Sequence, residues 1–304
     1  MMVRANGIDL ACDSFGDASA PAILLIAGLG TQMTRWTEKF CMALAAQGFR
    51  VIRFDNRDCG LSTHFSHAPA PDFQAMMAGT MPVAAYTLDD MAADALGLLD
   101  AMGIERAHFV GRSMGGMIAQ IMASSSPLRV LSLTSIMASS GNPGLPPPDS
   151  ALMAMMMSPA PDPHCDQEGF VAHSLRFAQR LASPDLPFDD EAQRALILAE
   201  LGRGRDPGGA ARQMVAVAMD GDRRERLARI TAPALVIHGT ADPMFPLAHG
   251  QDTAAAIPHA RFLPMEGMGH ELPDLFQADV VKAIARMVRD VSYTGPLAAF
   301  SQPA

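Results

Sequence analysis

Cysteine is scarce in this sequence, and the common patterns that bind metals or nucleotides are missing. The 304 residues include four cysteines, which are far apart and form no C-x-x-C pair: Cys12, Cys41, Cys59 and Cys165. Such spacing is typical of reduced thiols rather than of a disulfide framework. Because the sequence also has no H-E-x-x-H pattern, no Asp-rich calcium loop and no G-x-G-x-x-G after an expected strand, we expect neither a metal nor another cofactor.

Long apolar runs and an excess of basic residues are missing as well. The longest apolar run, residues 22–27, is too short to span a bilayer, and the first ten residues lack the apolar centre of a signal peptide. The formal net charge of -9 argues against a nucleic-acid-binding surface. We therefore expect a cytoplasmic protein that binds neither membranes nor nucleic acid. Its oligomeric state stays open, a homo-oligomer included.

One stretch near residue 225 is nevertheless rich in arginine. It contains Arg223, Arg224, Arg226 and Arg229 within seven positions. Charged residues in a helical stretch are mostly exposed, so we interpret this cluster as the solvated face of a helix.

Apolar runs alternate with helical patterns along most of the chain, which has 49% hydrophobic and 18% charged residues. Two short runs, 3–6 and 8–13, are expected to form a hairpin through Asn6-Gly7. Buried strands are expected at 23–26, 51–54, 107–110, 130–136, 234–238 and 261–263, and the first helix is expected at 36–46. This alternation predicts the α/β fold class: a mostly parallel sheet flanked by helices. Between 140 and 229 helical patterns follow one another without strands, around 169–181, 190–201, 209–219 and 222–230. We therefore predict a core of residues 1–139 and 230–304 and an inserted helical cap of residues 140–229. The stretch 63–86 has little periodicity and is expected to be a functional or mobile loop.

The pattern G-x-S-x-G around Ser113 organises the chemistry. It follows an apolar run and precedes another, which is the strand, sharp turn and helix of a nucleophile elbow. Gly111 and Gly115 fit this turn because a side chain at either position would meet the neighbouring strand or helix. We predict that Ser113 is a nucleophile, and a serine needs a base to accept its proton.

His270 is the best candidate for that base among nine histidines. It follows the last expected strand, where sites gather in parallel sheets, and small residues precede it. Asp242 follows the strand 234–238 and is the expected carboxylate partner, which fixes the imidazole tautomer. Asp55 is the rival, but it precedes Ser113 in the chain. We expect Asp55 and Arg57 to hold their own turn together instead.

An acyl-transfer site also needs two fixed donors for the developing oxyanion. We predict the backbone N–H of Met114, directly after the nucleophile, and that of Leu29, in the loop after the strand 23–26. Only backbone chemistry is needed at Leu29, so its side chain is free to vary.

These residues resemble the α/β-hydrolase family over nearly the whole chain, and within it the branch of aclacinomycin methylesterase. The similarity lies in five places: Asp-Ser-Phe-Gly-Asp at 13–17, Asp-Asn-Arg-Asp-Cys-Gly-Leu-Ser at 55–62, the elbow at Ser113, Asp242-Pro243, and Gly-Met-Gly-His at 267–270. The resemblance implies Ser113, Asp242 and His270 as the triad and Leu29 and Met114 as the oxyanion hole. It departs from the usual pattern where Ala27-Gly28 replaces His-Gly.

Three classes of function are compatible with the expected triad and oxyanion donors. We favour a serine carboxylesterase that acts on apolar small-molecule esters, because a methionine run at Met153, Met155, Met156 and Met157 could line an adaptable apolar pocket. The second class is other chemistry on the same triad: carbon–carbon bond hydrolysis, lactone opening or perhydrolysis. The third is a non-enzymatic ligand-binding protein on a hydrolase scaffold.

Overall fold

An eight-stranded sheet forms the centre of the computed structural model, which describes residues 1–68, 71 and 83–293. Its strands lie in the order β1-β2-β4-β3-β5-β6-β7-β8. The strands are β1 (Met2–Ala5), β2 (Ile8–Phe15), β3 (Ala22–Ile26), β4 (Arg50–Phe54), β5 (Ala107–Arg112), β6 (Val130–Ile136), β7 (Ala234–Gly239) and β8 (Arg261–Met265). β1 and β2 join as an antiparallel hairpin through Asn6 and Gly7, which have positive φ angles of 46° and 79°. β2 is antiparallel to β4, and every pair from β4 to β8 is parallel.

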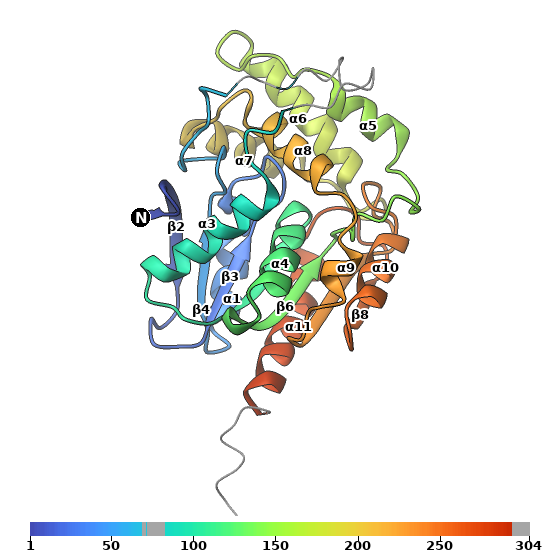
Figure 1. The fold of residues 1–304 in the computed structure, drawn as a ribbon. Helices are drawn as coiled ribbons and strands as arrows, with labels where there is room; N and C mark the ends of the chain where they lie inside the picture. The colour runs from blue at the N-terminus through green and yellow to red at the C-terminus, as the bar shows by residue number, and fades with distance from the viewer. Residues whose placement is uncertain (69–70, 72–82, 294–304) are drawn as a thin grey trace, which may run out of the picture.

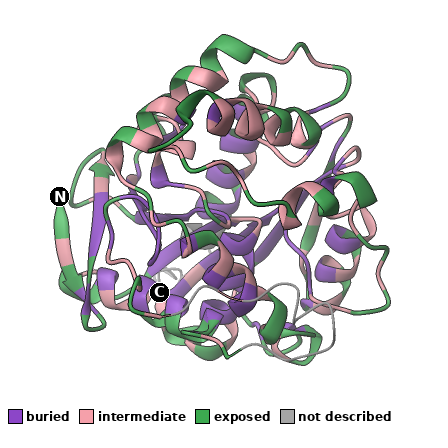
Figure 2. Cartoon of the chain, turned by 90° about the horizontal axis from the view of Figure 1, so that it is seen from above, coloured by how far each residue is buried: buried purple, intermediate pink, exposed green. Residues whose placement is uncertain are grey.

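Helices cover both faces of this sheet (Figure 1). They are α1 (Glu38–Ala45), α3 (Leu88–Ala101), α4 (Met114–Ser125), α10 (Ala248–Ala256) and α11 (Asp274–Tyr293), with short 3₁₀ turns η1 (Met33–Arg35) and η2 (Pro127–Arg129). Alternate residues of β3 pack on opposite faces: Leu24 joins the apolar cluster of α3 and α4, and Leu25 joins that of α1 and α11. Figure 2 shows the resulting buried centre. The predicted α/β fold class is therefore confirmed.

Five further helices lie between β6 and β7. They are α5 (Ser150–Met157), α6 (Gln167–Leu181), α7 (Asp190–Arg203), α8 (Gly209–Asp220) and α9 (Arg224–Leu227). We refer to α5–α8 as the cap helices, because Figure 1 shows them together beyond one edge of the sheet. α9 packs against α4 and α10 instead. α9 therefore packs with the helices of the core, although its residues fall within the stretch 140–229 that the sequence assigns to the cap.

Several local features differ from the sequence-based expectation. The first helix begins at Glu38 instead of residue 36, because Thr37 accepts a hydrogen bond from the Phe40 N–H and caps it. The prediction of a wholly solvated arginine cluster is wrong for Arg223. That side chain is 2% exposed and donates to Gln120 and to the Ser139 carbonyl.

Part of the stretch 63–86 lies outside the described residues, so its predicted functional role stays a prediction. Within the described part of the chain, no helix combines the length and the apolar character that a membrane span requires.

Candidate active site

Ser113 lies at a sharp turn between β5 and α4, with φ 54° and ψ -126°. Non-glycine residues rarely adopt this left-handed backbone, and such strain concentrates at functional sites. The glycines on either side make the turn possible. A Cβ on Gly111 would lie 2.0 Å from the Gly115 carbonyl oxygen, and one on Gly115 would lie 2.2 Å from that of Ile26. The backbone therefore has the geometry of a nucleophile elbow.

His270 connects Ser113 with Asp242, although 157 residues separate the serine and the histidine in the chain. Ser113 Oγ lies 3.0 Å from His270 Nε2, and His270 Nδ1 lies 2.8 Å from Asp242 Oδ2. A carboxylate can only accept, so Nδ1 carries the proton and Nε2 is free to accept the serine hydroxyl. The structure thus brings the three predicted triad residues into one hydrogen-bonded line.

Asp242 is buried, and both of its carboxylate oxygens accept hydrogen bonds. Its Oδ1 accepts hydrogen bonds of 2.8 Å from the N–H groups of Met244 and Phe245. Burial by itself raises the pKa of Asp242, but the charge and hydrogen bond of His270, together with His238 and the Phe245 N–H, outweigh it, so the net pKa is lowered. The carboxylate is therefore ionised when it faces the imidazole.

His238, a second histidine at this carboxylate, has no role in the sequence-based triad. It lies on β7 with no exposed surface, and its Nε2 is 2.7 Å from the Phe245 carbonyl oxygen and 3.5 Å from Asp242 Oδ2. Since a carbonyl accepts, Nε2 carries the proton. Burial lowers the pKa of His238 despite the nearby carboxylate. His238 is consequently a neutral donor that helps to shape the turn holding Asp242.

The two backbone N–H groups that the sequence predicts for the oxyanion hole are not engaged within the protein. Neither the N–H of Leu29 nor that of Met114 has an acceptor among the residues that the structure describes. The loop of Leu29 lies close to the serine, because a Cβ on Gly28 would be 3.4 Å from Ser113 Cβ. Met114 begins α4, whose N-terminal N–H groups and dipole favour negative charge.

Polar side chains from distant segments of the chain hold the loop after β3 in place. Gln213 of α8 is fully buried, and its Oε1 accepts from the Gly30 N–H at 2.7 Å while its Nε2 donates to the Arg57 carbonyl at 2.8 Å. Asn56 Nδ2 donates to the Ala27 carbonyl at 3.1 Å. One cap helix therefore holds the segment that contains Leu29. No local sequence signal marks Gln213, because the contact spans 183 positions.

Asp55 binds other groups than the histidine, as expected, but it does not pair with Arg57. Its oxygens accept from the N–H groups of Met33 and Leu61 and from Arg203 of α7. Arg57 instead forms a bidentate pair with Asp94 of α3. The expectation is thus wrong for Arg57, whose side chain binds α3, whereas Asp55 does bind its own turn at the Leu61 N–H.

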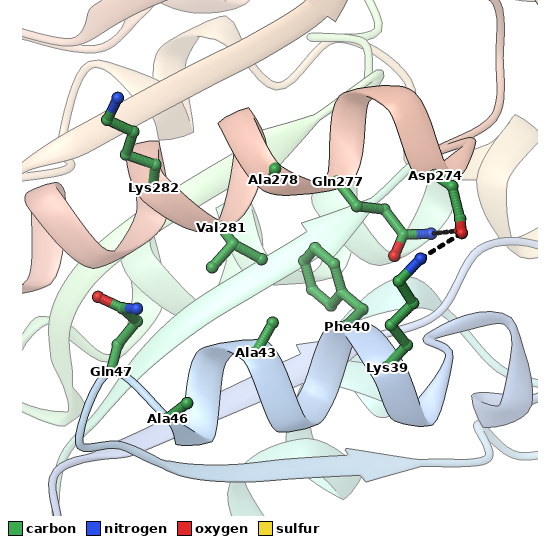
Figure 3. A pocket seen from close by; sticks show the side chains of 10 residues that line it. All are labelled: Lys39, Phe40, Ala43, Ala46, Gln47, Asp274, Gln277, Ala278, Val281 and Lys282. Atoms are coloured by element: carbon green, nitrogen blue, oxygen red, sulfur yellow. Dashed lines mark hydrogen bonds and ion pairs between the residues drawn. The ribbon is translucent and has the colours of Figure 1, made fainter.

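A separate surface hollow of about 590 Å³ lies between α1 and α11 (Figure 3). Phe40, Ala43 and Val281 form its floor, and an ion pair between Lys39 and Asp274 lies at one end. None of the triad residues lines it. Among the described residues, no group of three or more His, Cys, Asp or Glu side chains is placed to hold a metal ion.

The chain is similar to known hydrolases over most of its length. The model of the alpha/beta hydrolase fold family matches residues 21–275. Rhodomycin D methylesterase DauP of Streptomyces sp. (strain C5) is 32% identical, over 95% of this chain and 97% of that protein. 3-Oxoadipate enol-lactonase 2 of Acinetobacter baylyi is 26% identical, over 87% of each chain. The crystal structure of the enol-lactonase from Burkholderia xenovorans LB400 superposes with a TM-score of 0.72 and 26% identity, covering 96% of this chain and 100% of that one.

Proposed function

The chain belongs to the alpha/beta hydrolase fold family, and from that premise we propose that it hydrolyses carboxylic esters of small molecules through an acyl-enzyme formed on Ser113. The observation that carries this proposal is the hydrogen-bonded line from Ser113 Oγ through His270 to Asp242. The similarity to a methylesterase supports an ester as the substrate.

The first half of the reaction forms the acyl-enzyme. Ser113 Oγ attacks the ester carbonyl carbon while its proton moves to His270 Nε2. The carbonyl electron pair moves onto the oxygen, and the N–H groups of Leu29 and Met114 donate to that oxyanion. Asp242 stabilises the imidazolium. When the oxyanion collapses, the bond to the alcohol oxygen breaks, and this oxygen takes the proton from His270 Nε2.

The second half regenerates the serine. A water molecule attacks the acyl carbon and gives its proton to His270 Nε2, and the oxyanion forms again at the same two N–H groups. Collapse then breaks the bond to Ser113 Oγ, which recovers its proton, and the carboxylic acid leaves. The same donors and the same base thus serve both halves without rearrangement.

Substrate choice falls to the cap helices in this proposal. The N–H of Asp149, which caps α5, donates to the Pro243 carbonyl at 2.9 Å, so α5 begins beside the turn of Asp242. α5 carries the methionine run, and Met155, Met156 and Met157 remain half-buried. Flexible thioether side chains in that position favour apolar substituents on the ester.

Lactone opening is the second candidate, since it uses the same attack on a cyclic ester. The enol-lactonases at 26% identity favour it. In that reaction the alcohol stays attached to the acyl group until water releases the hydroxy acid.

Hydrolysis of 4-nitrophenyl butyrate by purified protein tests the proposal. We expect turnover in the wild type and a loss on the order of 10³-fold or more in Ser113→Ala. A fluorophosphonate should add mass at Ser113 alone. Ser125→Ala is the matched control, because Ser125 is exposed at the other end of α4. Wild-type turnover in Ser113→Ala would contradict the proposal.

A further inference from the structure

Arg112 directly precedes the nucleophile and is poorly satisfied for a half-buried arginine. Its guanidinium stacks on Trp36, 5.6 Å from the ring centroid, and Nη1 donates weakly to the Arg35 carbonyl at 3.5 Å. Within the described part of the chain, Nε and Nη2 have no acceptor and the side chain forms no ion pair. The residue keeps part of its surface exposed. Two of its three guanidinium nitrogens are therefore unpaired among the described residues.

Six other buried or half-buried arginines are paired with carboxylates, whereas Arg50 donates to Ser14 and to the Ala18 carbonyl. These pairs are Arg35–Glu200, Arg53–Asp13, Arg57–Asp94, Arg203–Asp55, Arg212–Asp58 and Arg223–Asp220. Removing a charge from water without a partner is costly, and a bound anion would offset that cost. Burial lowers the pKa of Arg112 to about 10, helped by the charge of Arg35 and opposed by Glu200 and Glu271. Arg112 is thus still cationic at neutral pH.

The two acidic side chains in its vicinity are already engaged. Glu200 accepts both Nε and Nη2 of Arg35, at 2.8 and 2.7 Å. Glu271 accepts from the Ser183 N–H at 3.0 Å. Neither forms an ion pair with Arg112, so the protein's own carboxylates leave this guanidinium available.

The position of Arg112 next to the nucleophile makes an anion bound there relevant to the reaction. Consecutive Cα atoms are about 3.8 Å apart, so the Arg112 and Ser113 side chains start from neighbouring points. Arg112 follows Val110 on the face of β5 that packs against Trp36, while the elbow turns Ser113 toward His270. Glu271, whose charge acts on the Arg112 guanidinium, directly follows His270 in the chain, so an anion bound there would lie on the side of the sheet that carries the catalytic histidine.

We infer that Arg112 is a specificity-determining residue that binds a carboxylate of the substrate, so that the preferred ester or lactone carries one anionic group. A guanidinium offers parallel N–H donors that match the two oxygens of a carboxylate. The inference rests on the proposed hydrolysis at Ser113 and adds a charged group to the otherwise apolar substrate. The carboxylate belongs either to the acid part or to the alcohol part of the ester.

Matched pairs of esters test this inference. For the acid part, kcat/KM is measured with mono(4-nitrophenyl) glutarate and with 4-nitrophenyl butyrate. For the alcohol part, it is measured with the butyrate esters of 4-hydroxybenzoate and of phenol. In Arg112→Met the ratio of anionic to neutral ester should fall about 10- to 100-fold for one of the two pairs, the effect of losing a charge-assisted hydrogen bond. Arg112→Lys should retain part of the ratio.

Arg106→Met is the control, because Arg106 is exposed just before the other end of the same strand and its loss removes the same net charge. Its ratios should match those of the wild type. Equal losses on both esters of each pair, or unchanged ratios in Arg112→Met, would overturn the inference and show that the stack on Trp36 is structural. If Ser113→Ala kept wild-type turnover, the proposed function itself would fail, which is a separate result.

Discussion

Asp242 Oδ2 accepts a 2.8 Å hydrogen bond from His270 Nδ1 while the carboxylate itself is buried. Asp242→Asn should preserve this shape but remove the charge and admit the wrong imidazole tautomer. Because Nε2 would then carry the proton, it could not accept that of Ser113. We expect kcat to fall on the order of 10⁴-fold with little change in melting temperature. Steady-state kinetics and thermal unfolding measure the two effects.

Combining Asp242→Asn with His270→Ala tests whether Asp242 and His270 act as a unit. His270→Ala alone should be at least as damaging as Asp242→Asn, and the double variant should be scarcely slower than His270→Ala. Losses that multiply in the double variant would show that Asp242 has a role apart from His270.

Gln213 links the cap to the oxyanion hole, which leads to a second prediction. Gln213→Leu removes the acceptor of the Gly30 N–H and the donor to the Arg57 carbonyl. The loop of Leu29 would then be held less firmly, and small displacements of an oxyanion donor are costly. We expect kcat to fall about 10- to 100-fold, with a smaller change in KM.

Gln251→Leu is the matched control, since Gln251 is exposed on α10. A merely structural role for Gln213 would lower the melting temperature and the amount of active enzyme without changing kcat per active site. Titration of active sites with the fluorophosphonate distinguishes these cases.

The residues that could be predicted from the sequence are those with a local signal. Ser113 has glycines at fixed positions, and Asp242 and His270 each lie a few residues after a strand, so chain order and strand ends were enough to select them. The hairpin at Asn6-Gly7 was predicted for the same reason, because this pair adopts the required positive φ angles.

The missed features depend on contacts between distant segments. Gln213, Arg223 and His238 look ordinary in the sequence, and only the folded chain shows which groups they face. The helix α5 was missed because its residues are almost uniformly apolar, so no helical period is visible. Its start at Asp149, which caps Leu152, became evident only from the backbone geometry.

His108 leads to a prediction about stability and pH. It is 2% exposed on β5, and its Nδ1 lies 2.8 Å from Ser132 Oγ on β6. Burial, aided by the charge of Arg106, lowers its pKa from 6.5 to about 4. Between these values the unfolded chain binds a proton that the folded protein does not. The contribution to stability is therefore complete above pH 6.5 and is lost as the pH falls toward 4, by about 3 kcal/mol in total.

Urea unfolding of the wild type and of His108→Gln between pH 7.5 and 4.5 measures this contribution. The glutamine keeps a polar group opposite Ser132 but has no proton to gain, and all other titrating groups are common to both proteins. The free energy of unfolding of the wild type should thus fall more steeply below pH 6.5 than that of the variant. The slopes of the two free energies of unfolding against pH should differ by up to about 1.4 kcal/mol per pH unit, the limit for one proton. Parallel curves would mean that folded His108 accepts its proton as readily as the unfolded chain does, against the burial that the structure gives it.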